Sequence, residues 1–164
     1  LQPPPGVKLI NVKSAKDMNN TVKKFLNVDI AVFTAAVSDI TPTKYINDKI
    51  KKGNFKNILI KKNPDIIKNI TANKSKKNKF IVGFAAETKN HIQNAKKKLI
   101  EKNCDLVVVN KISKKNNVFG SDYNQVSFIN KNKIIKFKKM TKIDVAKNLL
   151  NVINKNLKKW NKKY

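Results

Sequence analysis

Charged side chains that could bind a ligand follow the first apolar stretch of the chain. Residues 30–33 are apolar and lead into AAVSDI, which contains Asp39, and the lysine-rich KIKK at residues 49–52 begins ten residues later. In an open α/β sheet, ligands bind outside the carboxyl ends of the strands, where small residues let backbone N–H groups face the ligand. Lysine charge beside such a site suits phosphate. The spacing therefore predicts a site for a phosphate-bearing ligand.

A second apolar stretch, residues 80–84, runs into VGFAAET, so two buried strands are expected to point at one site. Between the two stretches, Asn63 can cap a helix and Pro64 suits its first turn. The N–H groups at a helix N-terminus attract anions, which makes residues 63–66 a candidate contact for a phosphate or a nucleobase. An ordinary capped helix is the alternative explanation.

Two more lysines, Lys98 and Lys102, are four residues apart in a helix expected over residues 89–103, and therefore lie on one face of it. That face either directs two charges at a ligand or is an ordinary solvated surface. All 37 cationic residues of the chain are lysine, and none is arginine. Any single lysine run can therefore also follow from a biased composition.

The net charge of +27 raises the question of nucleic-acid binding, since basic surfaces gain affinity by releasing counterions from phosphates. The lysines are spread over the whole chain, and it contains neither an aromatic RNA-binding signature nor a zinc-finger spacing. Without arginine, the chain also lacks the usual bidentate reader of guanine. We expect nonspecific attraction to polyanions and no dedicated nucleic-acid role.

The 164 residues suit one domain with a substantial core. The one cysteine, Cys104, cannot form an intrachain disulfide and is expected to be a buried or half-buried thiol. No apolar run reaches membrane-spanning length and no signal peptide opens the chain, which predicts a cytoplasmic protein with no membrane partner. Leu1 in place of methionine, followed by QPPPG, predicts that the sequence is a fragment.

Hydrophobic periodicity predicts alternating strands and helices. Strands are expected over residues 7–12, 29–33, 55–61, 80–84 and 106–110, with helices after Ser14, Asn63 and Lys89, a hairpin of residues 125–129 and 133–137, and a last helix capped by Thr141. This order predicts an α/β fold, a Rossmann-like three-layer domain with a mostly parallel sheet and a C-terminal β-hairpin plus helix. GxGxxG and Walker A sequences are missing, which disfavours standard dinucleotide and P-loop ATP sites.

Five motifs together resemble one family. AAVSDI, KIKK, IKKNPDI, VGFAAET and NCDLVVVN occur in the order seen in phosphopantothenate-cysteine ligase, an enzyme of coenzyme A biosynthesis that is often fused to a flavin decarboxylase. The resemblance implies that residues 1–164 are a ligase domain whose amino-terminal part, with a glycine-rich region and an asparagine of the second half-reaction, is missing. Ile40 departs from the pattern, because an aromatic residue often follows the aspartate of the first motif.

What the resemblance implies is a CTP-dependent ligation. The carboxylate of 4'-phosphopantothenate would attack the α-phosphorus of CTP to give an acyl-cytidylate and pyrophosphate, and the amine of cysteine would then displace CMP. Mg²⁺ would assist, and FMN would be present only if a decarboxylase domain is fused upstream. The family also implies a homodimer, or a higher oligomer in the fused form. The fragment by itself is expected to bind the nucleotide without completing catalysis.

The resemblance also assigns site residues. Lys49 would be the catalytic residue, placing charge at the triphosphate together with Mg²⁺, whose protein ligands are unknown. Asp39 would read the ribose or base rather than act as a base catalyst. The nucleotide site as a whole would comprise Phe33, Thr34, Ala35, Asp39, Lys49, Asn63, Pro64, Asp65, Ile66, Phe84, Lys98 and Lys102. The alternative of a different class is a noncatalytic basic Rossmann-like module that binds RNA or another polyanion.

Overall fold

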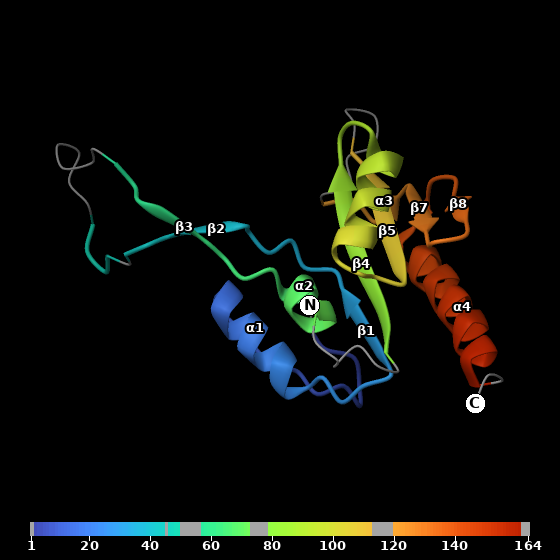
Figure 1. The fold of residues 1–164 in the computed structure, drawn as a ribbon, viewed down its shortest axis with the longest axis horizontal. Coiled ribbons are helices and arrows are strands. Elements are labelled where there is room, and N and C mark those ends of the chain that lie inside the picture. Colours follow the sequence, from blue (N-terminus) through green and yellow to red (C-terminus); the bar gives the residue numbers. More distant parts are fainter. Residues whose placement is uncertain (1, 45, 50–56, 73–78, 113–119, 162–164) are drawn as a thin grey trace.

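The chain folds around one mixed sheet (Figure 1). The structure is a computed structural model and describes residues 2–44, 46–49, 57–72, 79–112 and 120–161. The five strands of the sheet have the order β1-β4-β5-β7-β8. Their bounds are Ile30–Phe33 for β1, Phe80–Glu87 for β4, Leu106–Lys111 for β5, Val126–Ile129 for β7 and Ile134–Lys136 for β8. Strands β1, β4 and β5 run parallel, whereas β7 and β8 form the expected antiparallel hairpin.

Helices cover both faces of the sheet, so the predicted three-layer α/β fold is confirmed (Figure 1). The helices are α1 (Ala15–Lys24), α2 (Ile66–Ala72), α3 (His91–Glu101) and α4 (Lys142–Asn161). The central strand β5 is apolar on both faces because its side chains alternate between two cores. Val107 and Val109 pack with Ala95 and Leu99 of α3, and Leu106 and Val108 pack with Leu149 and Ile153 of α4.

Hydroxyl caps start two of the helices where the sequence predicts them. The backbone N–H of Asp17 donates to Ser14 Oγ over 3.1 Å at the start of α1. At the start of α4, the backbone N–H of Asp144 donates to Thr141 Oγ1, also over 3.1 Å. Thr141 also belongs to a two-stranded sheet, in which β9 (Met140–Thr141) pairs with β6 (Tyr123–Asn124).

No helix in the described part of the chain is long and apolar enough to cross a membrane.

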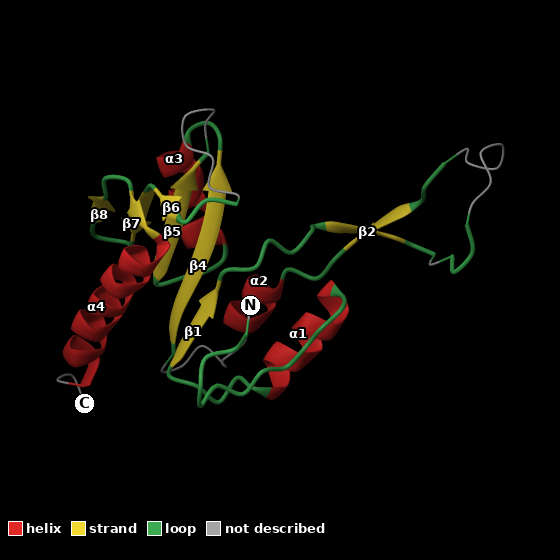
Figure 2. Ribbon diagram, turned by 180° about the vertical axis from the view of Figure 1, so that it is seen from behind, coloured by secondary structure: helices red, strands yellow, loops and turns green. Residues whose placement is uncertain are grey.

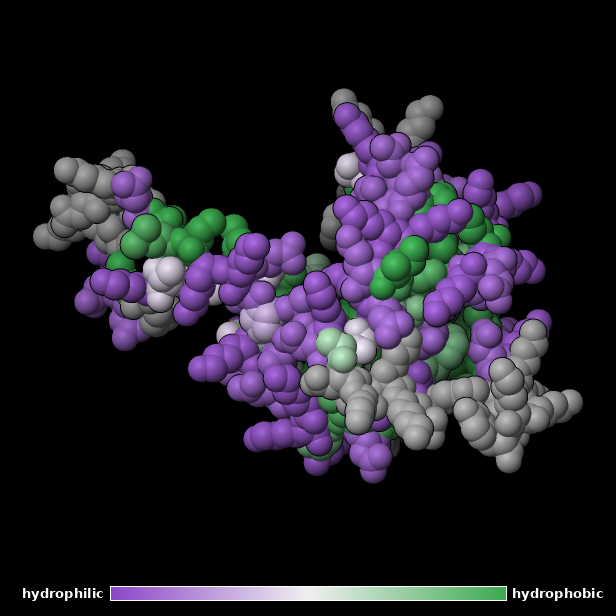
Figure 3. All heavy atoms as spheres, viewed as in Figure 1, coloured by the Kyte–Doolittle hydropathy of each residue, from purple (hydrophilic) through white to green (hydrophobic). Residues whose placement is uncertain are grey.

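A two-stranded arm projects from the body of the molecule (Figure 2). It consists of β2 (Ile40–Pro42) and the antiparallel β3 (Ile60–Lys62), which pair only with each other among the described strands. The prediction of a strand over residues 55–61 is wrong for 57–59, which form no strand, while residues 55 and 56 lie outside the described residues. Alternation could not locate this strand, because apolar side chains along the arm are exposed instead of facing a core (Figure 3).

The strand expected over residues 7–12 is also not formed. Val7, Leu9 and Val12 are exposed, and no described strand pairs with these residues. An alternating apolar pattern shows only that a segment could be a strand, since the strand exists only when a neighbour accepts its backbone hydrogen bonds. Among the described residues, β1 is therefore an edge strand of the sheet, with β4 as its one neighbour.

Gly83 allows α2 and the β5 side of the sheet to pack closely against β4. A Cβ at this position would lie 3.3 Å from Cys104 Sγ and 3.6 Å from Ile67 Cδ1. Cys104 is buried, as predicted, and Gly83 itself pairs with Phe33 on one side and Val107 on the other. A methyl group on residue 83 would project from the face of the sheet toward the Cys104 and Ile67 side chains, so the Cys104 side chain would have to shift by a few tenths of an ångström.

We therefore expect Gly83→Ala to lower the free energy of unfolding by about 1–2 kcal/mol, because it overpacks a filled core. Urea unfolding measures the loss. In a double-mutant cycle with Cys104→Ala, part of the loss should return, since the smaller side chain frees space beside the new methyl group. If the losses of unfolding free energy from the two substitutions were fully additive, contact with Cys104 would not be what makes a methyl group at residue 83 destabilising.

Candidate functional site

A cleft of about 580 Å³ opens at the carboxyl ends of β1, β4 and β5. The register of the sheet creates it. Phe33, the last residue of β1, pairs with Gly83, whereas β4 continues to Glu87 beside β5. The end of β4 therefore has a neighbour on only one side, and the chain leaving β1 turns away from it. Phe84, Ala85 and Ala86 line the cleft at this overhang.

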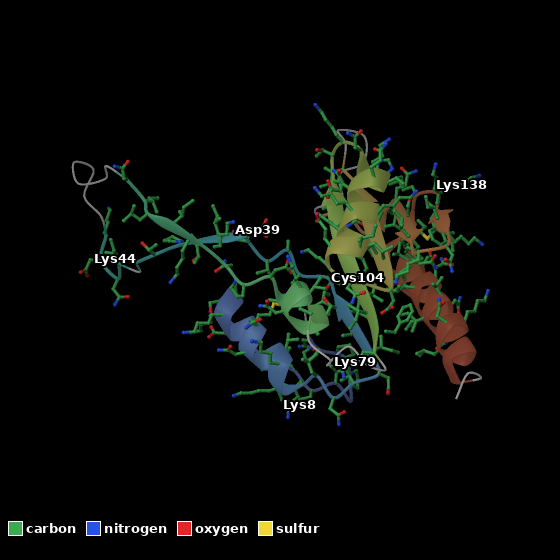
Figure 4. All side chains as sticks on the ribbon, in the orientation of Figure 1. Lys8, Asp39, Lys44, Lys79, Cys104 and Lys138 are labelled. Atoms are coloured by element: carbon green, nitrogen blue, oxygen red, sulfur yellow. The ribbon has the colours of Figure 1, made fainter. Side chains whose placement is uncertain are left out.

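The cleft brings together most of the residues that the sequence predicts for a nucleotide site. The end of β1 and the loop after it supply Phe33, Thr34, Ala35 and Asp39, and the start of α2 supplies Pro64, Asp65 and Ile66. Phe84 comes from β4, Lys98 from α3, and Lys102 from the position directly after α3. Asp39 lies on the inner part of the arm, nearer to the body than Lys44 (Figure 4). Ligand contact by these residues stays a prediction.

Lys49 and Asn63 do not line this cleft. Lys49 is exposed in the loop that connects the two strands of the arm, and its neighbours Lys51 and Lys52 lie outside the described residues. Nothing in the described fold turns the Lys49 side chain toward β4 or α3. The structure thus separates the predicted catalytic lysine from the predicted nucleotide pocket.

Asn63 holds the loop after β1 instead of capping a helix, so its predicted capping role is wrong. Its Nδ2 donates to the backbone oxygen of Ser38 over 2.9 Å, and its backbone N–H donates to the Asp39 oxygen over 2.8 Å. Helix α2 begins three residues later, at Ile66, where the N–H of Lys68 donates to Asp65 Oδ1 over 3.1 Å. Asp65 is therefore the cap, and Asn63 fixes the loop that carries Asp39.

Both lysines at the cleft are paired with carboxylates. Lys102 Nζ lies 3.3 Å from Asp65 Oδ2, an ion pair that joins the residue after α3 to the start of α2. Lys98 Nζ lies 2.7 Å from Glu87 Oε1 at the end of β4. The two ammonium groups are thus held by acidic residues of the elements that form the cleft walls, and a phosphate would meet cations that already have fixed partners.

Glu87 is the best enclosed of these charges. Its side chain is only 14% exposed, against 40% for Lys98, and its second oxygen accepts a hydrogen bond of 2.7 Å from Asn94 Nδ2. Burial by itself would raise the pKa of the Glu87 carboxyl, but the hydrogen bonds from Lys98 and Asn94 and the Lys98 charge outweigh burial, so this pKa lies below its ordinary value of 4.5. Glu87 is therefore ionised at neutral pH.

Sequence reasoning missed the roles of Glu87 and of a second polar residue, Asn110. Asn110 lines the cleft from the end of β5, and its Oδ1 accepts a hydrogen bond of 2.9 Å from Nδ2 of the buried Asn124. For Glu87 the available signal was its place in VGFAAET, after a strand predicted to point at the site, whereas Asn110 ends a predicted apolar strand that was not assigned to the site. Within the described residues, no three His, Cys, Asp or Glu side chains form a group that could hold a metal ion.

The lowered pKa of Glu87 predicts a pH dependence of stability. The interactions of the Glu87 carboxylate with Lys98 and Asn94 contribute stability above about pH 4.5. That contribution is lost as the pH falls further, because the Glu87 carboxylate of the folded state then becomes protonated. We expect Glu87→Gln to show a shallower loss of unfolding free energy than wild type when urea unfolding is followed from about pH 6 to about pH 3.

Glu101→Gln is the control for this experiment, since Glu101 is exposed and lies 3.7 Å from Lys97 on the same helix. Exposed pairs of this kind contribute little to stability, so the acid slope of Glu101→Gln should stay close to that of wild type. If Glu87→Gln and wild type lost stability with the same slope, the two hydrogen-bond donors would not be stabilising the Glu87 carboxylate.

Comparison with known proteins relates the chain to a defined group. A family model described as the DNA/pantothenate metabolism flavoprotein C-terminal domain matches residues 1–157. The coenzyme A biosynthesis bifunctional protein CoaBC of Borreliella burgdorferi is 42% identical over 154 residues, which are 92% of this chain and 38% of that protein. The protein of the same name from Bacillus subtilis is 37% identical and is likewise covered to 38% of its length.

Solved structures agree with these relatives. The crystal structure of the C-terminal domain of a CoaBC protein superposes with a TM-score of 0.79 at 32% identity, covering 97% of this chain and 70% of that one. The DNA/pantothenate metabolism flavoprotein from Streptococcus pneumoniae has the same fold, with a TM-score of 0.71 at 20% identity. The chain thus spans well under half of the curated relatives and most of the matched crystal structure.

Proposed function

Because the chain belongs to the family of DNA/pantothenate metabolism flavoprotein C-terminal domains, we propose that it carries the phosphopantothenate-cysteine ligase activity of coenzyme A biosynthesis. The observation that supports this best is the cleft itself. Two lysines, two phenylalanines and a run of small residues meet there at the carboxyl ends of parallel strands, where an α/β sheet binds its ligands. Such a lining suits a nucleotide with a charged phosphate chain.

The proposed reaction has two steps. The carboxylate of 4'-phosphopantothenate attacks the α-phosphorus of CTP, forming an acyl-cytidylate and releasing pyrophosphate. The amine of cysteine then attacks the acyl carbon, and CMP leaves with the electron pair of the broken C–O bond as the amide forms. Lys98 and Lys102 place positive charge at the cleft, where charge builds up on the departing phosphates. Asp39 contacts the ribose or the base, and Phe33 and Phe84 hold the nucleotide.

Mg²⁺ fits this cleft as a companion of the nucleotide. The described residues supply no three-ligand cluster of protein side chains, and magnesium ordinarily keeps several waters while bound by one or two carboxylates and substrate phosphates. Asp39, Asp65 and Glu101 are the carboxylates that line the cleft, and Asp65 and Glu101 already pair with Lys102 and Lys97, so we assign this part to Asp39. When bound, the ion would neutralise phosphate charge. FMN would belong to a decarboxylase domain fused upstream, and none of the residues discussed above is assigned to it.

Lys49 remains the proposed catalytic cation at the triphosphate. Since it lies on the arm and not in the cleft, this role requires either a different position of the arm or a second copy of the chain. The proposed homodimer makes the second route possible. A fusion with a decarboxylase domain would allow a higher oligomer.

The arm is the surface that we propose for the homodimer. An isolated two-stranded ribbon is marginally stable in water, and its outer edges present unpaired backbone groups. On this arm Ile46, Ile58, Leu59 and Ile60 are exposed, with Leu59 70% exposed. A second arm could cover these side chains and pair with an edge, which would account for exposed apolar residues along a projection.

Leu59→Lys should therefore convert the dimer to a monomer, because it places a charge in the proposed apolar contact. Sedimentation velocity gives the masses of both species. Leu150→Lys is the matched control, since Leu150 is 59% exposed on α4, away from the arm, and should leave the dimer intact. A Leu59→Lys protein that sediments as wild type would remove the arm from the interface.

Nucleotide selectivity tests the proposed ligand against the alternative of a basic module that binds polyanions. Thermal unfolding with equal concentrations of CTP or ATP and Mg²⁺ should show the larger rise in Tm for CTP, because a ligand stabilises the folded state by RT ln(1 + [L]/Kd) and CTP should have the lower Kd. Asp39→Ala should lose most of the CTP effect and keep any effect of heparin. Equal shifts with CTP, ATP, heparin and RNA, ranked by charge alone, would favour the polyanion binder.

Activity is tested by incubating the chain with 4'-phosphopantothenate, CTP, Mg²⁺ and cysteine, and measuring the amide product by mass spectrometry. A version extended upstream to the length of the curated relatives is the comparison. We expect product from the extended protein and little from residues 1–164. The family resemblance places an asparagine of the amide-forming step upstream of these residues, and losing one donor to the oxyanion of such a step typically costs about a hundred- to a thousandfold in rate. Absence of product from both proteins would refute the proposed activity.

A further inference from the structure

We propose that Glu87 is a positioning residue that holds the Lys98 ammonium at the cleft wall, ready for a phosphate. This inference rests on the proposed function in that it takes the cleft as the CTP site. Glu87 is not itself among the residues that line the cleft, whereas Lys98 is. Glu87 would therefore act on the ligand through Lys98 and not by touching it.

The side-chain contacts of Glu87 come from one face of α3. Lys98 Nζ and Asn94 Nδ2 each donate to one carboxylate oxygen over 2.7 Å, and these two residues are four apart on the helix. Asn94 Nδ2 also donates to the Lys89 backbone oxygen over 3.2 Å, which ties it to the turn before α3. The backbone oxygen of Glu87 accepts a hydrogen bond of 2.9 Å from the N–H of Ile112. Both the main chain and the side chain of Glu87 are therefore fixed.

The Glu87–Lys98 pair differs from the other ion pairs on α3. Lys97 and Glu101 are 3.7 Å apart with both side chains largely exposed, and Lys102 and Asp65 are 3.3 Å apart with each about one-third exposed. The Glu87–Lys98 pair is the shortest of the three and has the best enclosed carboxylate. Exposed pairs contribute little and exchange readily with water, so Glu87, at the end of β4, is the acid among these three pairs best able to keep a lysine of α3 in one conformation.

Holding Lys98 helps a ligand in two ways. A free lysine side chain loses much rotamer freedom when it binds, and a lysine that is already ordered avoids most of that cost. The ammonium group has three N–H donors, and Glu87 uses only one of them. Two donors remain for phosphate oxygens, so Lys98 can keep its contact with Glu87 while it binds the nucleotide.

Electrostatics alone predicts the opposite effect for a substitution at Glu87. Removing a negative charge near the cleft should strengthen the binding of a tetra-anionic nucleotide. Positioning predicts that the same change weakens it, because Lys98 would no longer be held in place. Whether the affinity for CTP rises or falls therefore decides between electrostatics and positioning, whatever the size of the change.

The experiment is calorimetric titration with CTP and Mg²⁺ of wild type, Glu87→Gln and Asn94→Ala. We expect Kd to rise about tenfold in Glu87→Gln and about threefold in Asn94→Ala, which leaves the net charge unchanged. Asp29→Asn is the charge control, because the exposed Asp29 precedes β1 at the end of the sheet opposite the cleft. Its Kd should equal that of wild type. Tighter or unchanged CTP binding by Glu87→Gln would overturn the inference.

A double-mutant cycle separates positioning from general structural damage. In a Lys98→Gln background, adding Glu87→Gln should change Kd by less than about twofold, since the group that Glu87 holds is gone. A further rise of about tenfold in that background would show that Glu87 acts on the fold and not through Lys98.

Reactivity of Lys98 toward a trace acylating reagent gives a measurement that needs no ligand. Peptide mass spectrometry of the folded protein should show Lys98 labelled more slowly than the exposed Lys97, and several-fold faster in Glu87→Gln than in wild type. Equal labelling of Lys98 in both proteins would overturn the positioning role. If wild type failed to bind CTP while this protection was present, the proposed function would fail and the positioning of Lys98 would stand.

Discussion

Parallel pairing of β4 between β1 and β5 is the constraint on which the rest of the structure depends. It requires a strand buried on both faces, which the apolar residues of β4 and β5 supply, and it requires Gly83 at the point where Cys104 and Ile67 come closest. The register that results stops β1 opposite Gly83 while β4 continues to Glu87. The cleft is the space left by that difference in length, so the packing that stabilises the domain also determines where a ligand can bind.

The lysines of the cleft are distinguished by their carboxylate partners and not by the high net charge of the chain. With +27 on the chain, a cationic pocket could be an accident of composition. Instead, Lys98 and Lys102 each have a carboxylate partner on another element, Glu87 on β4 and Asp65 before α2. Unpaired surface lysines attract any polyanion, whereas ordered lysines favour a ligand whose phosphates match their positions. This pairing of the lysines supports the nucleotide site that we propose over nonspecific attraction.

The arm and the body follow different physical rules. The body has two apolar cores that bury the sheet from both sides. The arm has a pair of three-residue strands, and its described residues include exposed isoleucine and leucine side chains and no buried apolar cluster (Figure 3). The arm carries Lys49, and its inner part carries Asp39. If the arm forms the proposed dimer interface, association of two chains also determines whether Lys49 reaches a cleft.

The sequence by itself determined the α/β class, the hairpin, the helix caps at Ser14 and Thr141, and most of the cleft lining. These features depend on local periodicity, on hydroxyl caps and on motif order, which are readable along the chain. Tertiary structure alone decided that residues 7–12 form no strand, that Asn63 ties down a loop while Asp65 caps α2, and that Lys49 lies away from the cleft. It also decided that Glu87 meets Lys98. Each of these depends on which distant residue becomes a neighbour, because a strand needs a partner strand and a charge needs a counter-charge, and no local pattern specifies either.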